Sequence, residues 1–587
     1  MNLLNQIKDK VGSAFQAAGL PTDNTLVRLS DRPDIGDYQA NGALPLAKTL
    51  HQNPRTLAEK AADRLRADPF FKKVSVDGPG FINMQVSDET LGHLVYPVLA
   101  GSRCGYERPD NPKTVFLDYG GPNIAKALHV GHLRPALIGE AIKRICAFAG
   151  DKTIGDVHLG DWGKPMGLLI AALQDRQPDL PYFDSNHTGD YPAEAPFTGH
   201  DLEVMYPLAS QRAKEDPAFA ERAHTCTRLL QDGHPGYRAL WEHFVRLSVA
   251  DIRRLYDELG VSFDLWRGES HVHDRLWAMI KHLRANGTII PDQGAEIIPL
   301  GQAKSGNDLP PLIMVKSDGA VMYAATDLAT IEERMDEFHP DAILYVVDAR
   351  QALHFEQVFT GARKIGLADG ISLEHLGFGT INGTDNKPFK TRDGGIPTLR
   401  YLIDTAVRAA RKKMEAGEMG RDLTPAEQDK IAHIVGVSAL KFADLSNERM
   451  KNYIFDEDKL TSTEGKTGPY LLYAMVRMKS VLAKMQATAT LNPDDAVRIT
   501  DPAERHLLLR LYALQDSVQT AYDNRAPHVL ADYLFKLAQD FNLFYHDCPI
   551  KGADPETQKS RLTLTKYTLH VASTIADVLG LTVPDKM

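Results

Sequence analysis

The feature that most constrains this chain is a strand-like run that leads, through a short loop, to two histidines at a helix start. The run spans residues 114–117, and the histidines are His129 and His132, in the pattern H-x-G-H. Apolar side chains then recur at helical spacing as far as a glycine stop at Gly150. Strand, loop and helix in this order are typical of a parallel α/β sheet, and the free N–H groups at such a helix start favour a phosphate.

The H-x-G-H pattern predicts an ATP site. His129 and His132 can donate hydrogen bonds to phosphoryl oxygens during attack on the α-phosphate, and Gly131 lets an adenine ring lie against the backbone. Four letters alone carry little weight, because such a pattern arises by chance in roughly one chain in twenty of this composition. A local hydrogen bond by a helix-start histidine is the simpler explanation. Lys126 is either a partly desolvated cation that acts on phosphate or an ordinary surface lysine.

A second cationic segment spans residues 386–395, after a strand predicted at 376–378. It carries Lys387, Lys390 and Arg392 among flanking glycines. A mobile cationic loop of this kind can close over a triphosphate and neutralise the charge on a leaving pyrophosphate. The alternative is a solvated basic surface loop, which is what most charge runs are.

A third group of residues is typical of a pocket for a cation. Tyr323 and Asp327 are four residues apart, so on a helix they share one face. A phenol and a carboxylate suit a multi-donor cation such as a guanidinium; Asp118 can add a second carboxylate and Gln351 an amide. For each residue taken singly, a helix cap or a surface position is the alternative.

Length and composition limit the class of protein. At 587 residues the chain is too long for one core, and about three or four domains are expected. The net charge of −10 argues against a general nucleic-acid coating protein, although a local basic groove can coexist with an acidic remainder. The four cysteines form no C-x-x-C pair, so we expect no structural zinc, no disulfide framework and a reducing, cytoplasmic location. No secretion signal and no membrane-spanning run is recognised.

The pattern of periodicities predicts three domains. Residues 1–108 indicate a small α+β domain, with a helical stripe followed by two strands around a Gly-Pro-Gly turn. Residues 109–427 alternate strand and helix around a parallel sheet, with a helical insert at about 177–265. Residues 428–587 indicate an all-helical bundle, with helices expected at 431–443, 470–485, 503–522, 527–545 and 557–579.

The helical bundle also carries aromatic residues interleaved with cations, and this pattern can clamp unpaired bases. The alternative for helical Tyr and Phe is a place in the core. The residues concerned are Tyr470, Tyr473, Arg477, Lys479, Asn542, Phe544 and Tyr545.

Segments along the whole chain together resemble one family, the class I arginyl-tRNA synthetases. The similarity covers residues 36–39, 78–83, 121–134, 158–163, 323–328, 345–354, 387–392, 467–474 and 584–587, in the family's order. The resemblance implies an α/β Rossmann-type catalytic domain with a parallel sheet, a small N-terminal α+β domain that contacts tRNA and an all-α C-terminal anticodon-binding bundle. It implies ATP-dependent activation of L-arginine to arginyl-adenylate, followed by transfer to the 3′ end of tRNA-Arg.

The resemblance also implies roles for single residues. The catalytic set would be Lys126, His129, His132, Lys387 and Lys390, and the ATP-binding set Asn123, His129, Gly131, His132 and Lys390. The arginine-binding set would be Asp118, Asn123, Tyr323, Asp327 and Gln351, and the tRNA-binding set Gln39, Tyr470, Tyr473 and Arg477. Mg²⁺ would accompany ATP, the chain itself would supply no metal ligands, and a monomer is expected.

Two departures from the family pattern stand out. Where class I enzymes usually carry Lys-Met-Ser-Lys, this chain has the sequence KPFKTR at 387–392, so either Lys387 or Lys390 can meet pyrophosphate. Relatives commonly carry two serines where this chain has Gly120 and Gly121. The alternatives are a class I synthetase for another amino acid, a smaller H-x-G-H nucleotidyltransferase and a non-catalytic tRNA-binding relative. Retention of the histidines and lysines argues against the last.

Overall fold

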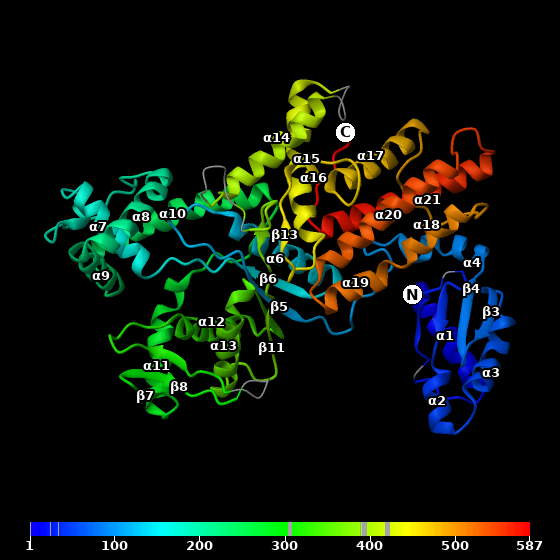
Figure 1. Ribbon diagram of the computed structural model, residues 1–587, viewed down its shortest axis with the longest axis horizontal. Coiled ribbons are helices and arrows are strands. Elements are labelled where there is room, and N and C mark those ends of the chain that lie inside the picture. Colours follow the sequence, from blue (N-terminus) through cyan, green and yellow to red (C-terminus); the bar gives the residue numbers. More distant parts are fainter. Residues whose placement is uncertain are drawn as a thin grey trace. The chain divides into compact units, whose positions relative to one another are not determined.

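The computed structural model describes residues 2–23, 25–32, 34–302, 308–387, 389, 396–416 and 423–587 (Figure 1). The chain forms two compact units, which are described separately. The sheet unit comprises residues 111–409 and 447–460, and the terminal unit comprises residues 1–110, 410–446 and 461–587. No helix among the described residues is long and apolar enough to cross a membrane.

The centre of the sheet unit is a four-stranded parallel sheet in the order β11-β10-β5-β6. Its strands are β5 (Thr114–Tyr119), β6 (Lys152–Asp156), β10 (Ala342–Val346) and β11 (Ser372–His375). Continuous apolar runs such as β10 are buried on both faces, as parallel sheets require. In the register of this sheet Asp118 lies opposite Tyr345 on one side and Asp156 on the other. The carboxyl ends of three strands therefore present polar side chains at one edge.

The strand predicted at residues 376–378 is wrong, because the sheet pairing ends one residue earlier. Leu376 and Phe378 are buried, which accounts for the apolar pattern. At Gly377 the chain passes close to another segment, since a Cβ there would lie 3.2 Å from Cα of Ala349.

Helices cover this sheet and extend the unit, and Figure 1 shows α7 to α10 gathered as one helical cluster. Three of these helices, α8 to α10, lie inside the predicted insert. An antiparallel sheet β7-β8-β9, which was not predicted from the sequence, lies farther along the chain. The helices are α6 (Val130–Ala149), α7 (Lys164–Arg176), α8 (Gly199–Glu215), α9 (Pro217–Gln231), α10 (Pro235–Glu258), α11 (His273–Ala285), α12 (Tyr323–Phe338), α13 (Ala352–Lys364), α14 (Leu399–Glu415, ending in the terminal unit) and α16 (Glu457–Leu460). The remaining strands are β7 (Ile290–Asp292), β8 (Ala295–Ile298), β9 (Leu312–Val315), β12 (Ile381–Asn382) and β13 (Tyr453–Ile454).

The N-terminal part of the terminal unit is the expected small α+β fold. Its antiparallel sheet has the order β1-β2-β4-β3, and β4 covers the predicted strand 81–86. The strands are β1 (Val27–Leu29), β2 (Tyr38–Ala40), β3 (Phe71–Asp77) and β4 (Phe81–Val86). The helices are α1 (Leu3–Ala17), α2 (Ala43–Leu50), α3 (Pro54–Arg66), α4 (Asp88–His93) and α5 (Val95–Leu99).

The C-terminal part of the same unit is a helical bundle, as the periodicity predicts. One predicted helix, 503–522, is instead two helices that meet at Ala513. The prediction joined them because the apolar periodicity continues across Ala513. The helices are α15 (Pro425–Leu445), α17 (Gly468–Lys484), α18 (Pro502–Tyr512), α19 (Leu514–Asp523), α20 (Pro527–Asp547) and α21 (Pro555–Val578).

The packing of α6 on β5 generates a stability prediction. A Cβ at Gly139 would lie 2.3 Å from Cγ of Tyr119, whereas a Cβ at Gly12 in α1 would meet nothing within 4 Å. Gly139→Ala should lower the free energy of unfolding by about 1–3 kcal/mol through overpacking. Gly12→Ala should raise it by up to about 1 kcal/mol through helix propensity. Thermal unfolding of the two variants checks both signs; equal stability would mean that α6 moves away from β5 freely.

Candidate active site

The two motif histidines form a hydrogen-bonded helix cap. His129 is the N-cap of α6, and its Nδ1 accepts from the Gly131 N–H at 3.1 Å. Nδ1 of His132 accepts from the His129 N–H at 3.1 Å, and the two ring centroids are 4.1 Å apart. An Nδ1 that accepts a hydrogen bond holds no proton, so each neutral ring carries its proton on Nε2. Both histidines therefore keep an Nε2–H group available as a donor.

Burial keeps both rings uncharged at neutral pH. It lowers the pKa of His129, with a further contribution from the charge of Lys126. Burial, followed by the neighbouring His129, lowers the pKa of His132 to about 3. Gly131 is required for this geometry, because a Cβ there would lie 2.9 Å from Cε1 of His129. The pair can donate hydrogen bonds to phosphoryl oxygens without itself taking up a proton.

The loop before α6 lies against the loop after β6. The Ile124 N–H donates to the Gly160 carbonyl at 3.1 Å, and the Gly160 N–H donates to the Pro122 carbonyl at 3.0 Å. A Cβ at Gly160 would lie only 2.1 Å from Oδ1 of Asn123, so this side chain lies directly over the glycine. A Cβ at Gly121 would likewise lie 2.7 Å from the His158 carbonyl. The two loops approach so closely that a side chain at Gly121 or Gly160 would displace its neighbours, which explains glycine at these positions.

Asp118 is tied to an internal arginine. Its Oδ2 accepts from Nη2 of Arg334 on α12 at 2.7 Å, and Asp156 accepts from the same nitrogen at 2.9 Å. Although burial alone would lower the pKa of Arg334, the nearby Asp118 and other neighbours raise it above its usual range. The guanidinium is therefore a permanent cation between two strand ends. A direct contact of Asp118 with a substrate stays a prediction.

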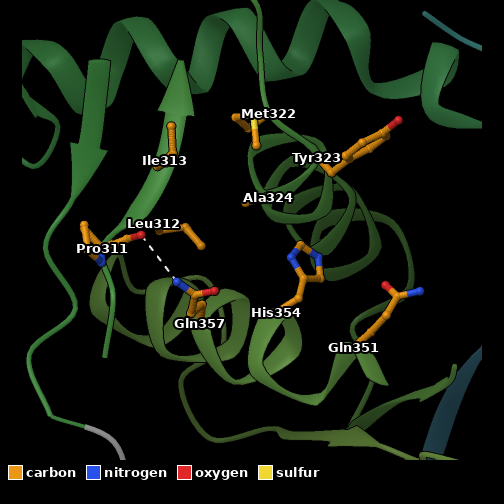
Figure 2. Close-up of a pocket in the computed structure, with 9 residues that line it drawn as sticks. All are labelled: Pro311, Leu312, Ile313, Met322, Tyr323, Ala324, Gln351, His354 and Gln357. Atoms are coloured by element: carbon orange, nitrogen blue, oxygen red, sulfur yellow. Dashed lines mark hydrogen bonds between the residues drawn. The ribbon is translucent and has the colours of Figure 1, made fainter. Parts of the chain in front are cut away.

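Three more of the predicted arginine-pocket residues, Tyr323, Asp327 and Gln351, lie around the start of α12, whereas Asn123 lies over Gly160 in the loop before α6. A cavity of about 260 Å³ lies at the start of α12, and Figure 2 shows Tyr323, Gln351 and His354 on one side of it, from α12, the turn before α13 and α13 itself. Asp327, one helical turn after Tyr323, bonds to Nε2 of His354 at 2.6 Å. This bond raises the pKa of His354, against the effect of its burial. Tyr323 is 69% exposed and so lies at the rim.

Glu269 lies close enough to Asp327 for the two carboxyls to influence each other, and it was not predicted as a candidate from the sequence. Burial raises the pKa of this carboxyl to about 7, and the negative charges of Asp161 and Asp327 contribute. The residue begins a short turn (Glu269–Val272) that follows Gly268, and a Cβ at Gly268 would lie 2.4 Å from Cγ of Asp161. The sequence signal that could have marked Glu269 is its place after Gly268, at the end of a run that contains Phe263 and Trp266. Its nearness to Asp327, 58 residues away, is a property of the fold.

Only part of the predicted cationic loop can be placed. Lys387 is exposed, and its carbonyl accepts from the Gly383 N–H at 2.8 Å. Lys390 and Arg392 lie outside the described residues. Phe389 packs against Phe455, with ring centroids 5.0 Å apart.

In the terminal unit, the predicted tRNA-binding residues of α17 and α20 form one cluster. The Arg477 guanidinium lies 4.7 Å from the ring centroid of Tyr473 and 5.6 Å from that of Tyr545. Arg477 donates to Oδ1 of Asn542 at 2.7 Å, and Asn542 donates to the Tyr470 hydroxyl at 2.9 Å. Tyr473 and Tyr545 are exposed, so the cluster offers aromatic faces and a cation to an unpaired base.

Other candidates in this unit have different surroundings. Phe544 is fully buried, and Lys479 pairs with Asp585 at 2.9 Å. Gln39 lies on β2 and donates to Oδ1 of Asn83 at 2.9 Å. The Arg28 guanidinium approaches Oε1 of Gln39 at 3.4 Å, so this glutamine is held in a polar row on the small sheet.

Three family models match the chain. The model described as tRNA synthetases class I (R), catalytic domain, matches residues 95–457. The DALR anticodon binding domain matches residues 471–587, and the arginyl tRNA synthetase N terminal domain matches residues 2–86.

Curated relatives and solved structures agree with these models. Arginine–tRNA ligases of Alkaliphilus oremlandii and Hyphomonas neptunium are each 44% identical, with 100% of both chains covered. The arginyl-tRNA synthetase of Plasmodium falciparum superposes with a TM-score of 0.81 at 24% identity, covering 100% of this chain and 99% of the other. That of Thermus thermophilus has a TM-score of 0.79 at 23% identity, covering 100% of both. These likenesses confirm the predicted fold, and with the 44% relatives they confirm the resemblance: the chain belongs to the class I arginyl-tRNA synthetase family.

Proposed function

We propose that this chain activates L-arginine with ATP and transfers it to the 3′ end of tRNA-Arg. The single observation that supports this best is that one unit holds both the histidine cap and, around the start of α12, a pair of neighbouring carboxyls. The cap suits a nucleotide phosphate, and the carboxylates Asp327 and Glu269 suit a guanidinium. Family membership supports the same reaction.

In the first step, an arginine carboxylate oxygen attacks the α-phosphorus of ATP. The bond to the bridging oxygen of pyrophosphate breaks, and its electron pair leaves with pyrophosphate. The Nε2–H groups of His129 and His132 donate to the phosphoryl oxygens on which charge develops, and Lys126 adds a cation on the same side. Lys387 or Lys390 neutralises the leaving group. A hydroxyl of the tRNA 3′ end then attacks the carbonyl carbon, and AMP leaves.

Selection of arginine is a matter of charge and donor count. Asp327 is oriented by His354, and Glu269 is about half protonated near pH 7, because burial raises its pKa to about 7. A guanidinium offers five donors and a permanent charge, so its arrival favours the ionised form of both carboxyls. Tyr323 and Gln351, which line the cavity, complete the donor and acceptor set. Asn123 would contribute from the loop before α6, where its Oδ1 lies over Gly160. We keep Asp118 in the proposed arginine-binding set, with its position fixed by the pair with Arg334.

We assign Mg²⁺ to the ATP phosphates, where it would supply further positive charge when bound. Among the described residues, His271, Glu333 and Glu337 have the spacing of a metal cluster. This cluster does not fit a metal, because Arg267 donates to Glu333 at 3.0 Å and to Glu337 at 2.7 Å. The cation would therefore arrive with the nucleotide.

The proposed tRNA contacts lie in the terminal unit. Tyr470, Tyr473 and Arg477 would receive unpaired bases of the anticodon loop by stacking and by the cation over the rings. Gln39 would meet the outer corner of the tRNA. We also propose that the chain acts as a monomer, since one chain supplies every catalytic group named above. A cytoplasmic location stays part of this proposal, in keeping with the family to which the chain belongs.

The overall proposal is tested by ATP–pyrophosphate exchange with each of the twenty amino acids, with and without tRNA. We expect exchange with arginine alone, and only when tRNA is present, because the family typically activates its amino acid in the tRNA complex. Exchange driven by another amino acid, or by none, would overturn the assignment.

Asp327→Asn tests the arginine pocket. Loss of one charge of a desolvated pair costs about 2–5 kcal/mol, so the KM for arginine should rise at least about thirtyfold. The KM for ATP should change by less than about threefold, since the substitution touches no phosphate contact. Asp336→Asn is the matched control, because Asp336 lies on the same helix and pairs with Arg275 at the surface. An unchanged arginine KM in Asp327→Asn would remove Asp327 from the pocket.

The raised pKa of Glu269 predicts that arginine affinity depends on pH. With a pKa of about 7 the carboxyl is mainly neutral at pH 6 and mainly ionised at pH 8, so arginine affinity should rise about tenfold over this interval. His354 titrates in the same direction, because its protonation draws the charge of Asp327 away from the pocket. Glu269→Gln should therefore bind arginine more weakly at pH 8 and show a shallower slope. Calorimetric titration with arginine checks this, and identical slopes would exclude Glu269 from the pocket.

A further inference from the structure

The helical insert holds the backbone of the nucleotide loop. The Ser248 hydroxyl on α10 accepts from the Ala125 N–H at 2.9 Å, and the Tyr256 hydroxyl on the same helix donates to the Gly120 carbonyl at 2.5 Å. Trp241, also on α10, donates from Nε1 to the Asp161 carbonyl at 2.8 Å. One helix of the insert thus fixes both loops that face the histidine cap.

Ala125 shows why such support is needed. Its φ of +60° lies in the left-handed region, which is unfavourable for a residue with a Cβ. The buried hydrogen bond from its N–H to Ser248 helps to hold this conformation. Because the backbone conformation of Ala125 sets the direction of the next residue, the insert determines where Lys126 points.

A second helix of the insert then contacts the Lys126 side chain itself. Lys126 Nζ lies 4.8 Å from the ring centroid of Tyr206 on α8. Across the residues that the structure describes, no carboxylate pairs with Lys126, although its charge reaches both His129 and His132 and contributes to their lowered pKa values. The aromatic ring therefore holds the ammonium without neutralising it.

The choice of an aromatic partner has a chemical consequence. A carboxylate at the same place would attract Lys126 more strongly but would cancel its charge and repel a phosphate. The quadrupole of a tyrosine ring attracts a cation through its face and leaves the net charge in place. Tyr206 also lies close enough to Tyr323 to influence its pKa. Burial makes the largest contribution to raising that pKa, followed by Glu269 and then Tyr206.

We propose that Tyr206 is a positioning residue for adenylate formation: its ring face directs the uncompensated Lys126 ammonium toward the ATP phosphates. The inference rests on the proposed function and deepens it, because it assigns a helix of the insert to the phosphate-binding step.

Two substitutions separate the ring from the hydroxyl. Tyr206→Leu removes the π face and should lower kcat/KM for ATP in the exchange reaction about five- to thirtyfold. Tyr206→Phe keeps the face and should stay within about threefold of the parent. Tyr522→Leu is the matched control, because Arg525 lies over Tyr522 at the same 4.8 Å distance in the terminal unit, and its ATP parameters should not change.

A double-mutant cycle with Lys126→Met distinguishes positioning from general stability. If Tyr206 acts through Lys126, Tyr206→Leu should have no further effect in the Lys126→Met background, whereas a merely structural role would give additive losses. Equilibrium binding of ATP to the same four proteins repeats the cycle without any amino acid, so it tests Tyr206 even if arginine proves not to be the substrate. Additive effects, or equal losses in the Leu and Phe variants, would overturn the proposal.

Discussion

The buried guanidinium of Arg334 is the interaction on which the site depends. It donates to Asp118 and Asp156 at the ends of two neighbouring strands, and it lies over the rings of Phe116 and Tyr345 at 4.6 and 5.5 Å. A buried cation is tolerated only when carboxylates compensate it, so the strand ends cannot separate without leaving an unpaired charge. The same helix carries Tyr323 and Asp327 at its start, seven or more residues earlier. The position of the arginine pocket is thereby coupled to the register of the sheet.

The sheet unit carries groups of different charge at the histidine cap and at the start of α12. This difference matches the two proposed substrates, ATP and arginine. Next to the histidine cap the groups are neutral or cationic, since burial lowers the pKa values of His129 and His132 and Lys126 remains without an acidic partner among the described residues. Around the start of α12 the groups are carboxyls. Asp327 is hydrogen-bonded to His354, and Glu269 has a pKa of about 7. In the proposed reaction, a polyanion and a guanidinium would each meet complementary charge while their reacting atoms come together.

How much the sequence predicts depends on how local the cause is. The histidine cap, β5 and α6 follow from a few adjacent residues, and all were predicted. Helix bundle boundaries followed from periodicity, except where α18 and α19 share continuous apolar faces across Ala513. Glu269 was missed because its closeness to Asp327 arises from the packing of separate loops. The substrate contact of Asp118 stays a prediction, but no local pattern reveals that Arg334, 216 residues later, lies beside it.

Sequence patterns do not reveal that the helical insert supports the loop before α6. Its helices have ordinary amphipathic periodicity, which explains their mutual packing but says nothing of Ser248 or Tyr206 at the nucleotide loop. The unfavourable φ of Ala125 is stabilised by a hydrogen bond from its N–H to a helix more than one hundred residues away in the chain. An insertion between the halves of the sheet therefore does more than separate them. Through one hydroxyl and one aromatic ring it fixes the direction of the lysine that the loop's own sequence leaves undetermined.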